Sequence, residues 1–146
     1  MADKINTKYR AELSGSERIR NYIMGGHGTV TLESDSGIHH TYSFSCNEDK
    51  PNMLWIYTLT PNNEWVYVGY YHKTQACFKL TAKSKYTSDS AIVKGVAYIF
   101  KMILKPDYSD PRMHLLHEGI CCRCGRPLTN PSSIELGIGP YCATQI

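Results

Sequence analysis

Residues 53–72 read MLWIYTLTPNNEWVYVGYYH, and this stretch decides the fold class that we expect for the chain. Thr, Val, Tyr and Trp dominate the two runs on either side of the PNN at 61–63, and apolar side chains alternate with others. A period of two in such residues is typical of half-buried β-strands, and a short Pro-Asn segment between them is typical of a turn. The stretch therefore predicts a β-hairpin.

The same pattern extends on both sides of this hairpin. Upstream, TVTLESD and IHHTYSFSC predict a second hairpin that turns at Ser36 and Gly37. Downstream, ACFKL predicts a fifth strand. Every connection is too short for a parallel crossover, which needs a dozen or more residues. We therefore expect an antiparallel sheet of about five strands between Gly28 and Leu80.

Two helices are predicted outside this region. SGSERIRNYIMGG begins with serines that can cap a helix and ends with two glycines, which indicates a short helix from Ser16 to Met24. SDSAIVKGVAYIFKMILKP has Ser88 or Ser90 as a cap and carries a broad apolar stripe. The fold class we expect is α+β, with the five-stranded sheet packed by this one main helix.

Composition limits the classes of protein to which the chain can belong. It has 146 residues, of which 42% are hydrophobic, and this is enough for the core of one ordinary domain. The formal charge of +3 permits contact with nucleic acid or acidic proteins but does not require it. No run approaches the ~20 apolar residues of a membrane span, so we expect no membrane contact.

The cysteines cluster near the end of the chain, in HEGICCRCGRPLTNPSSIELGIGPYC at 117–142. Cys121 and Cys124 form a C-x-x-C pair, Cys142 follows later, and His117 lies four residues before the pair. Three cysteines and one histidine are a typical ligand set for Zn²⁺, and four protein ligands indicate a structural metal. Reduced thiols in a small apolar cluster are the alternative, and Cys122 can also replace a ligand.

These ligands define a predicted zinc-knuckle module over residues 111–146, after an α+β sheet domain over residues 1–110. Between the ligands, Asn130 and Pro131 are typical of the start of a short helix. Three thiolates and Zn²⁺ sum to a charge of about −1, which Arg123 and Arg126 can offset. Ordinary solvated surface charges are the alternative interpretation of these two arginines.

The pattern CxxCGRxLTxPxSxxxGxGPxC, which runs here from Cys121 to Cys142, resembles an uncharacterised zinc-knuckle domain of many bacteriophage and prophage proteins. The preceding HEG and the upstream GTVTL and YTLTPNNEWVYVGYY are similar to its longer members, so the resemblance covers roughly residues 13 to 146. Cys122 and the tyrosine-rich strand depart from the pattern. The resemblance implies a phage-type origin and a bound metal, but no activity. Because the sequence shows no signal peptide and no membrane span, we expect the protein in the cytoplasm of the bacterial host.

For the function, we expect a non-enzymatic phage-type accessory protein that binds a host protein, such as an inhibitor of a host or defence enzyme. The chain has eleven tyrosines and two tryptophans, and aromatic side chains are favoured anchors in protein interfaces. The residues that we expect to form the interface are Trp55, Tyr57, Trp65 and Tyr67. An inward-facing aromatic row in the core is the competing interpretation.

The alternative function is binding of single-stranded nucleic acid. Between Gly69 and Tyr86 the chain carries four lysines and no acidic residue, interleaved with aromatic residues. Lysines that neutralise phosphates beside rings that stack on bases are typical of single-strand recognition. The candidate residues are Lys73, Lys79, Lys83, Lys85, Arg123 and Arg126. Lysines that protect an exposed edge strand are the competing interpretation.

The sequence does not favour an enzyme. His39 and His40 are adjacent in a predicted strand, so their side chains point to opposite faces and cannot act as a pair. His72 has no recognisable acid or nucleophile nearby in the sequence. No phosphate-binding loop, dinucleotide fingerprint or metalloprotease motif is present. We therefore expect no catalytic residues.

Overall fold

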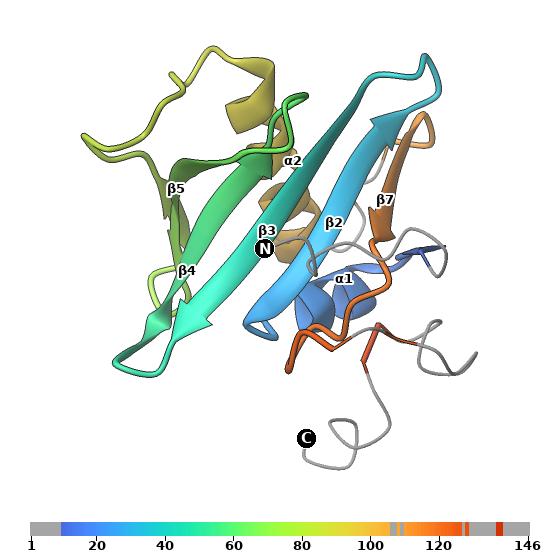
Figure 1. The fold of residues 1–146 in the computed structure, drawn as a ribbon. Coiled ribbons are helices and arrows are strands. Elements are labelled where there is room, and N and C mark those ends of the chain that lie inside the picture. The colour runs from blue at the N-terminus through green and yellow to red at the C-terminus, as the bar shows by residue number, and fades with distance from the viewer. Residues whose placement is uncertain (1–9, 106–107, 109, 127, 129–136, 139–146) are drawn as a thin grey trace.

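A computed structural model describes residues 10–105, 108, 110–126, 128 and 137–138 of the chain. Within these residues, seven strands form one sheet and two helices pack against it (Figure 1). In chain order they are β1 (Ala11–Glu12), α1 (Ser16–Ile23), β2 (His27–Ser34), β3 (His39–Asn47), β4 (Lys50–Leu59), β5 (Trp65–His72), β6 (Cys77–Lys79), α2 (Ala91–Leu104) and β7 (Met113–His117).

All strand pairings in the sheet are antiparallel, and the order across it is β1-β7-β2-β3-β4-β5-β6. Strands β2 to β6 form a meander of consecutive neighbours. The turn between β2 and β3 includes Gly37, whose φ of 94° lies in the left-handed region that glycine adopts without steric cost. The predicted hairpins therefore correspond to real neighbours in the sheet.

The expected sheet of about five strands packed by one main helix is wrong, because the described residues form seven strands and two helices. Strand β7 enters the sheet between β1 and β2, so that Leu32 pairs with Leu115 and Val30 pairs with His117. These partners lie far apart in the sequence, and a local pattern cannot show such pairing. Strand β1 has only two residues, too few to show a period.

Both helices pack against the same side of the sheet, which we call the inner face (Figure 1). The Ser90 hydroxyl accepts a hydrogen bond from the N–H of Val93 at 3.3 Å and caps α2. Gly95 of α2 leaves room for the Tyr42 hydroxyl, which a Cβ at this position would meet in a close contact. Neither helix of the described residues has the length and apolar character needed to cross a membrane.

The core lies between the inner face and the two helices. The Tyr71 and Phe100 rings stack there with their centroids 4.0 Å apart and their planes at 2°. Apolar side chains of alternate strand positions point to this side because side chains of a strand alternate between the two faces. The fully or almost fully buried strand residues are Val30, Leu32, Tyr42, Phe44, Leu54, Ile56, Val68, Tyr71 and Leu115.

Candidate functional site: an aromatic and basic face beside a cysteine turn

A row of side chains crosses the opposite side of the sheet, which we call the outer face. Trp55 of β4 pairs with Ser45 of β3 on one side and with Tyr70 of β5 on the other. Tyr70 in turn pairs with Lys79 of β6. Directly opposed residues of antiparallel strands point to the same face, so the row combines a hydroxyl, two aromatic rings and an ammonium group.

A bulge in β5 adds a second pair of rings to the outer face. The register shifts between Ile56 and Tyr57, which leaves Val68 as an extra residue of β5. Tyr67 and Tyr70 therefore both point outward, although a regular strand would place residues three apart on opposite faces. Tyr57 pairs with Tyr67, and their ring centroids are 5.6 Å apart.

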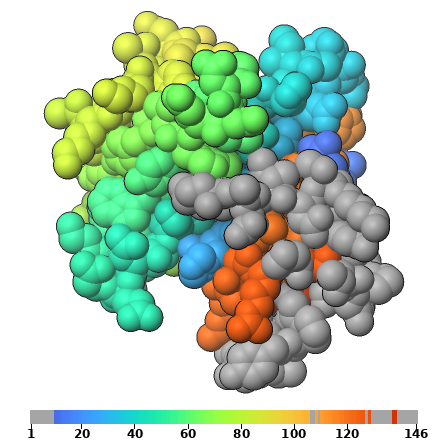
Figure 2. Space-filling view, in the orientation of Figure 1, coloured from blue at the N-terminus to red at the C-terminus, as the bar shows by residue number. Residues whose placement is uncertain are grey.

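These residues border a groove of about 670 Å³, which we call the aromatic groove. Such a volume lies within the range of roughly 300–1,000 Å³ that is usual for small-ligand sites. Side chains of β4 and β5, in green, reach the surface here beside the yellow-green loop that follows β6 (Figure 2). The lining comprises Trp55, Tyr57, Tyr67, Ser45, Asn47 and Lys83, together with loop residues 81–82.

The rings in the aromatic groove are tilted against one another. The planes of Trp55 and Tyr67 meet at 47°, and those of Trp55 and Tyr70 meet at 55°. The rings of the core pair Tyr71 and Phe100, by contrast, are parallel, and each covers one face of the other. Tilted pairs leave parts of their ring faces open, so the groove can accept a further aromatic ring.

Trp55 also has an unsatisfied polar group. Its Nε1–H is buried and has no hydrogen-bond partner within the described part of the chain. A buried donor without a partner costs about 1–3 kcal/mol, and such groups in native structures call for an explanation such as a functional role. The Lys50 ammonium lies 5.9 Å from the centre of the Trp55 ring, within the distance of a cation–π contact.

The four predicted lysines take different positions. Lys83 lines the aromatic groove, and Lys79 ends the row across the sheet. Lys85 is exposed, and its backbone N–H bonds to a β5 carbonyl at 3.4 Å. The Lys73 ammonium instead donates to the carbonyl of Met24 at 3.3 Å, at the end of α1. The structure thus brings two of the four to the groove and its row.

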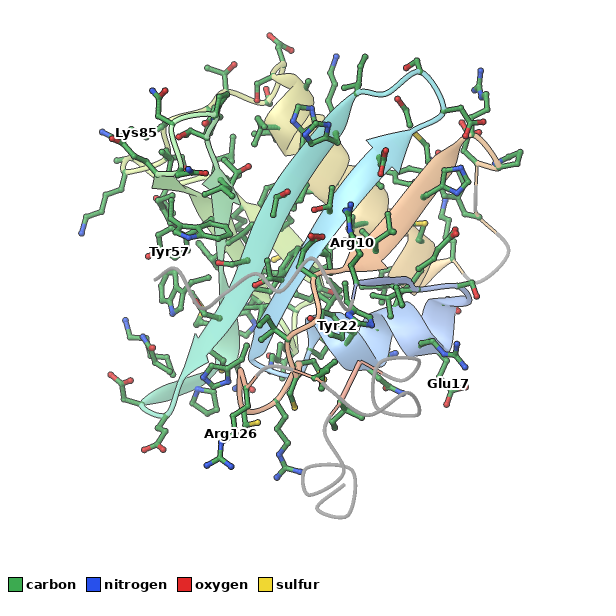
Figure 3. The ribbon with its side chains drawn as sticks, turned by 45° about the vertical axis from the view of Figure 1, so that its right-hand side comes forward. Arg10, Glu17, Tyr22, Tyr57, Lys85 and Arg126 are labelled. Atoms are coloured by element: carbon green, nitrogen blue, oxygen red, sulfur yellow. The ribbon has the colours of Figure 1, made fainter. Side chains whose placement is uncertain are left out.

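The two predicted arginines lie elsewhere. Arg123 and Arg126 are both exposed and belong to the turn that carries the cysteines. In Figure 3, Arg126 lies at the lower end of the molecule and Lys85 lies at the upper left, far from it. The six predicted cationic residues therefore do not form a single compact surface.

The four aromatic residues predicted for a protein interface all lie on the outer face, half-buried. Trp55, Tyr57 and Tyr67 line the aromatic groove, and Trp65 pairs with Leu59 at the other end of the hairpin. These four residues therefore do not form the inward-facing row of the competing interpretation. Sequence reasoning placed Tyr70 among the aromatic residues between the lysines but missed Ser45 and Asn47, because the strand register decides which face they occupy.

Residues 121–126 form a closed turn, which we call the cysteine turn. The Cys121 N–H donates to the carbonyl of Arg126 at 2.8 Å, and the Gly125 N–H donates to the carbonyl of Cys121 at 3.0 Å. Gly125 has a φ of 77°, which favours glycine. Cys121 is buried and Cys124 is exposed. The turn therefore carries both predicted thiol ligands on one short closed segment.

Two histidines near the cysteine turn differ in the ring nitrogen that carries the proton. The Gly119 N–H donates to His117 Nδ1 at 3.0 Å, so this nitrogen acts as an acceptor. His27 Nδ1 lies 2.7 Å from the carbonyl of Arg123 and must donate to it, because a carbonyl oxygen only accepts. In the neutral imidazole this hydrogen bond leaves the lone pair on His27 Nε2, the tautomer typical of metal-bound histidine.

The cysteine turn is docked on the connection between α1 and β2. The His27 N–H donates to the carbonyl of Cys122 at 2.8 Å. A Cβ at Gly25 would lie 2.5 Å from that carbonyl oxygen, so only glycine permits this approach. The Cys122 thiol points toward the carbonyl of Asn21, 3.9 Å away. Cys122 therefore packs against α1.

The predicted zinc ligands are only partly described by the structure. Cys142 lies outside the described residues, as do Asn130 and Pro131 of the predicted short helix. Within the ranges that the structure describes, no three His, Cys, Asp or Glu side chains form a group that could hold a metal ion. His117 is fully buried and stacks on Tyr22 with centroids 5.5 Å apart.

A buried carboxylate lies beside the β2 and β3 hydroxyls. Glu118 is 3% exposed, and its Oε2 is 3.0 Å from the guanidinium of Arg10. The Thr31 hydroxyl donates to the same oxygen at 3.2 Å and lies 2.7 Å from the Thr41 hydroxyl. Burial raises the pKa of Glu118, while the charge of Arg10 acts in the opposite direction.

The fold and site define an antiparallel seven-stranded sheet with helices on one face and aromatic, basic side chains on the other. Comparison with known proteins found a similarity for the C-terminal segment alone. Residues 112–146 match the model of a family of unknown function, DUF6011. No curated protein and no solved structure was found to match the chain.

Proposed function

We propose that the chain binds single-stranded nucleic acid on the outer face of its sheet. One observation carries this proposal: Lys83 lines the same groove as the rings of Trp55 and Tyr67. Lys79 stands in the adjoining row, beside Tyr70. An aromatic platform stacks on bases whatever their sequence, and lysines beside it neutralise the phosphates that connect them.

Salt provides the first test of this proposal. Each lysine that neutralises a phosphate releases counterions, so the affinity for a single strand should fall as salt rises. The double variant Lys79→Gln and Lys83→Gln should bind more weakly and show a smaller salt slope. Lys94→Gln is the matched control, because Lys94 is an exposed lysine of α2 on the other side of the sheet.

The measurement is a fluorescence anisotropy titration of a labelled single-stranded oligonucleotide at several salt concentrations. Wild-type protein and the Lys94→Gln variant should give the same slope. Equal slopes for the double variant and the wild type would remove the outer face from consideration as the binding surface.

Binding of a host protein is the second candidate, favoured by the half-exposed aromatic residues at the Trp65 end of the β4–β5 hairpin. Aromatic side chains that are half-buried in the free protein make suitable interface anchors. A pull-down from bacterial lysate distinguishes the candidates, because a protein partner survives nuclease treatment and a nucleic-acid-bridged one does not. Phage origin, a host cytoplasmic location and the lack of catalysis remain predictions.

We also propose that Cys121, Cys124 and Cys142 bind one Zn²⁺. Support comes from the closed cysteine turn with Gly125 in the left-handed region. The hydrogen bonds of the two histidines favour His27 over His117 as the fourth ligand, since His117 Nδ1 already accepts a hydrogen bond from the Gly119 N–H.

The role proposed for this metal is structural. Four protein ligands leave no open position for a reacting water, so the ion would hold the cysteine turn to the end of the chain. Elemental analysis of purified protein should give about one zinc per chain. A folded protein without metal, with unchanged stability after chelation, would contradict this assignment.

A further inference from the structure

The aromatic groove has three different sides, and their chemistry is that of a nucleotide. Trp55 and Tyr67 provide ring faces at an angle of 47°. Ser45 and Asn47 of β3 provide a hydroxyl and an amide, which can both donate and accept hydrogen bonds. Lys83 provides a positive charge at the loop side. A base, its polar edge and its phosphate match these three sides in turn.

Resting on the function proposed above, we infer that the aromatic groove is a pocket for one unpaired nucleotide of the bound strand. The base stacks on the ring of Trp55 or Tyr67, its hydrogen-bonding edge faces Ser45 and Asn47, and its phosphate contacts Lys83. The volume of about 670 Å³ is larger than flat stacking requires and is enough for a whole nucleotide unit.

Access to the polar edge of a base decides what the pocket can bind. In a duplex this edge is engaged in base pairing, so a paired base cannot reach Asn47 and also stack on Trp55. The groove therefore selects single strands over duplexes. It also gives Asn47 a role in base preference, because a carboxamide distinguishes donor edges from acceptor edges.

The first experiment uses free nucleoside monophosphates, AMP, GMP, CMP and UMP, in the Trp65→Phe variant, where Trp55 is the remaining tryptophan. At least one of the four should quench Trp55 fluorescence and compete with a labelled single-stranded oligonucleotide. A duplex of the same sequence should compete much more weakly. Equal competition by single strand and duplex would overturn the pocket.

The second experiment changes the polar side alone. Asn47 is exposed, so Asn47→Ala should leave the fold intact. The ratio of affinities among the four monophosphates should change by about fivefold, the value of one hydrogen bond, while the salt slope of oligonucleotide binding stays the same. Lys83→Gln should do the reverse, lowering the slope and keeping the ratio.

The two proposals fail in different ways. If oligonucleotides bind with a salt-dependent affinity but no monophosphate binds or competes, the nucleotide pocket is wrong and the outer face remains a general single-strand surface. If neither oligonucleotides nor monophosphates bind at low salt, both proposals are wrong. A nuclease-resistant protein captured on the outer face, together with no binding of any monophosphate, would also contradict the pocket.

Discussion

The ring of Tyr22 stacks on the imidazole of His117, with centroids 5.5 Å apart and planes at 24°. The Tyr22 hydroxyl donates to the carbonyl of Ile120 at 2.8 Å and accepts from the N–H of Thr29 at 3.3 Å. A single side chain of α1 thus joins β2, β7 and the residues that lead into the cysteine turn. Burial raises the pKa of Tyr22 far above its usual value, so this phenol stays protonated and able to donate.

Tyr22→Phe should therefore destabilise the fold without changing its core shape. The variant leaves the Ile120 carbonyl and the Thr29 N–H without their buried partner, which costs about 1–3 kcal/mol. Urea unfolding followed by circular dichroism measures this loss. Tyr108→Phe, at an exposed tyrosine, is the control and should change stability little. Equal stability of the two variants would contradict the joining role of Tyr22.

His114 should make stability depend on pH. Its Nε2 lies 2.8 Å from Asp35 and its Nδ1 lies 3.1 Å from Glu12, so both ring nitrogens face carboxylates. Hydrogen bonding to Asp35 first, and then to Glu12, raises the pKa of His114. A raised histidine pKa means that the stabilising contribution is complete below the unfolded value of about 6.5 and is lost as pH rises through the folded pKa.

The test compares the unfolding free energies of wild type and His114→Gln at about pH 6 and about pH 8.5. Below the first of these values and above the second, other groups dominate the pH dependence. The variant should lose stability at the lower pH and lose little at the higher pH. Comparing the two proteins is necessary because burial lowers the pKa of His40, whose contribution has the opposite sign. A pH-independent difference would show that the imidazolium does not form this contact.

Arg10→Gln should cost more stability at neutral pH than in acid. It removes the cation that faces the buried Glu118 carboxylate, and because Arg10 is 35% exposed the loss at pH 7 should be about 1–3 kcal/mol, below the usual cost of breaking a fully buried pair. Near pH 4 the carboxyl is protonated in the folded protein, since burial raises its pKa, and the loss should shrink.

Glu118→Gln tests the same pair from the other side. If the Arg10 effect is electrostatic, adding Arg10→Gln to the Glu118→Gln background should change stability much less than it does in the wild type. Unfolding free energies of the four proteins form the required cycle. Additive losses would assign the effect to packing of the arginine side chain.

Zinc affinity should distinguish the two candidate histidines. His27→Ala should weaken zinc binding, because this histidine keeps a lone pair on Nε2. His117→Phe retains a ring beside Tyr22 and should lower stability while keeping zinc affinity close to that of the wild type. Competition with a chromogenic chelator measures the zinc affinity of both variants. Cys124→Ser provides the positive control for the loss of a ligand. The opposite order would make His117 the ligand.

Local features of the sequence predicted much of the meander and of α2. The period of two in residues 53–72 and the turn at Gly37 are local, and so is the Ser90 cap. Strand β7 could not be predicted in the same way, since its partner Thr31 lies far away in the sequence and pairing at such a distance leaves no periodic signal. Its residues therefore fell into the predicted C-terminal module.

The candidate site was predicted in parts that did not fit together. Trp55 and Lys83 were assigned to two alternative surfaces, yet they line one groove. The bulge at Val68 turns Tyr67 and Tyr70 to the face on which Trp55 lies, and no periodic pattern in the sequence shows this. The available signal was Gly69, because glycine inside a strand often marks a bulge or a close approach of backbone. A Cβ there would lie 2.5 Å from the carbonyl of Lys79.

The position of β7 between β1 and β2 determines the order in which the protein can fold on the ribosome. Strands β2 to β6 are synthesised before Met113–His117, the residues of β7. At usual elongation rates of about 5–20 residues per second, the β2 edge then waits several seconds with unpaired N–H and C=O groups. A nascent chain that stops before β7 would present this edge to other chains, so the addition of β7 acts as the step that protects the β2 edge from aggregation.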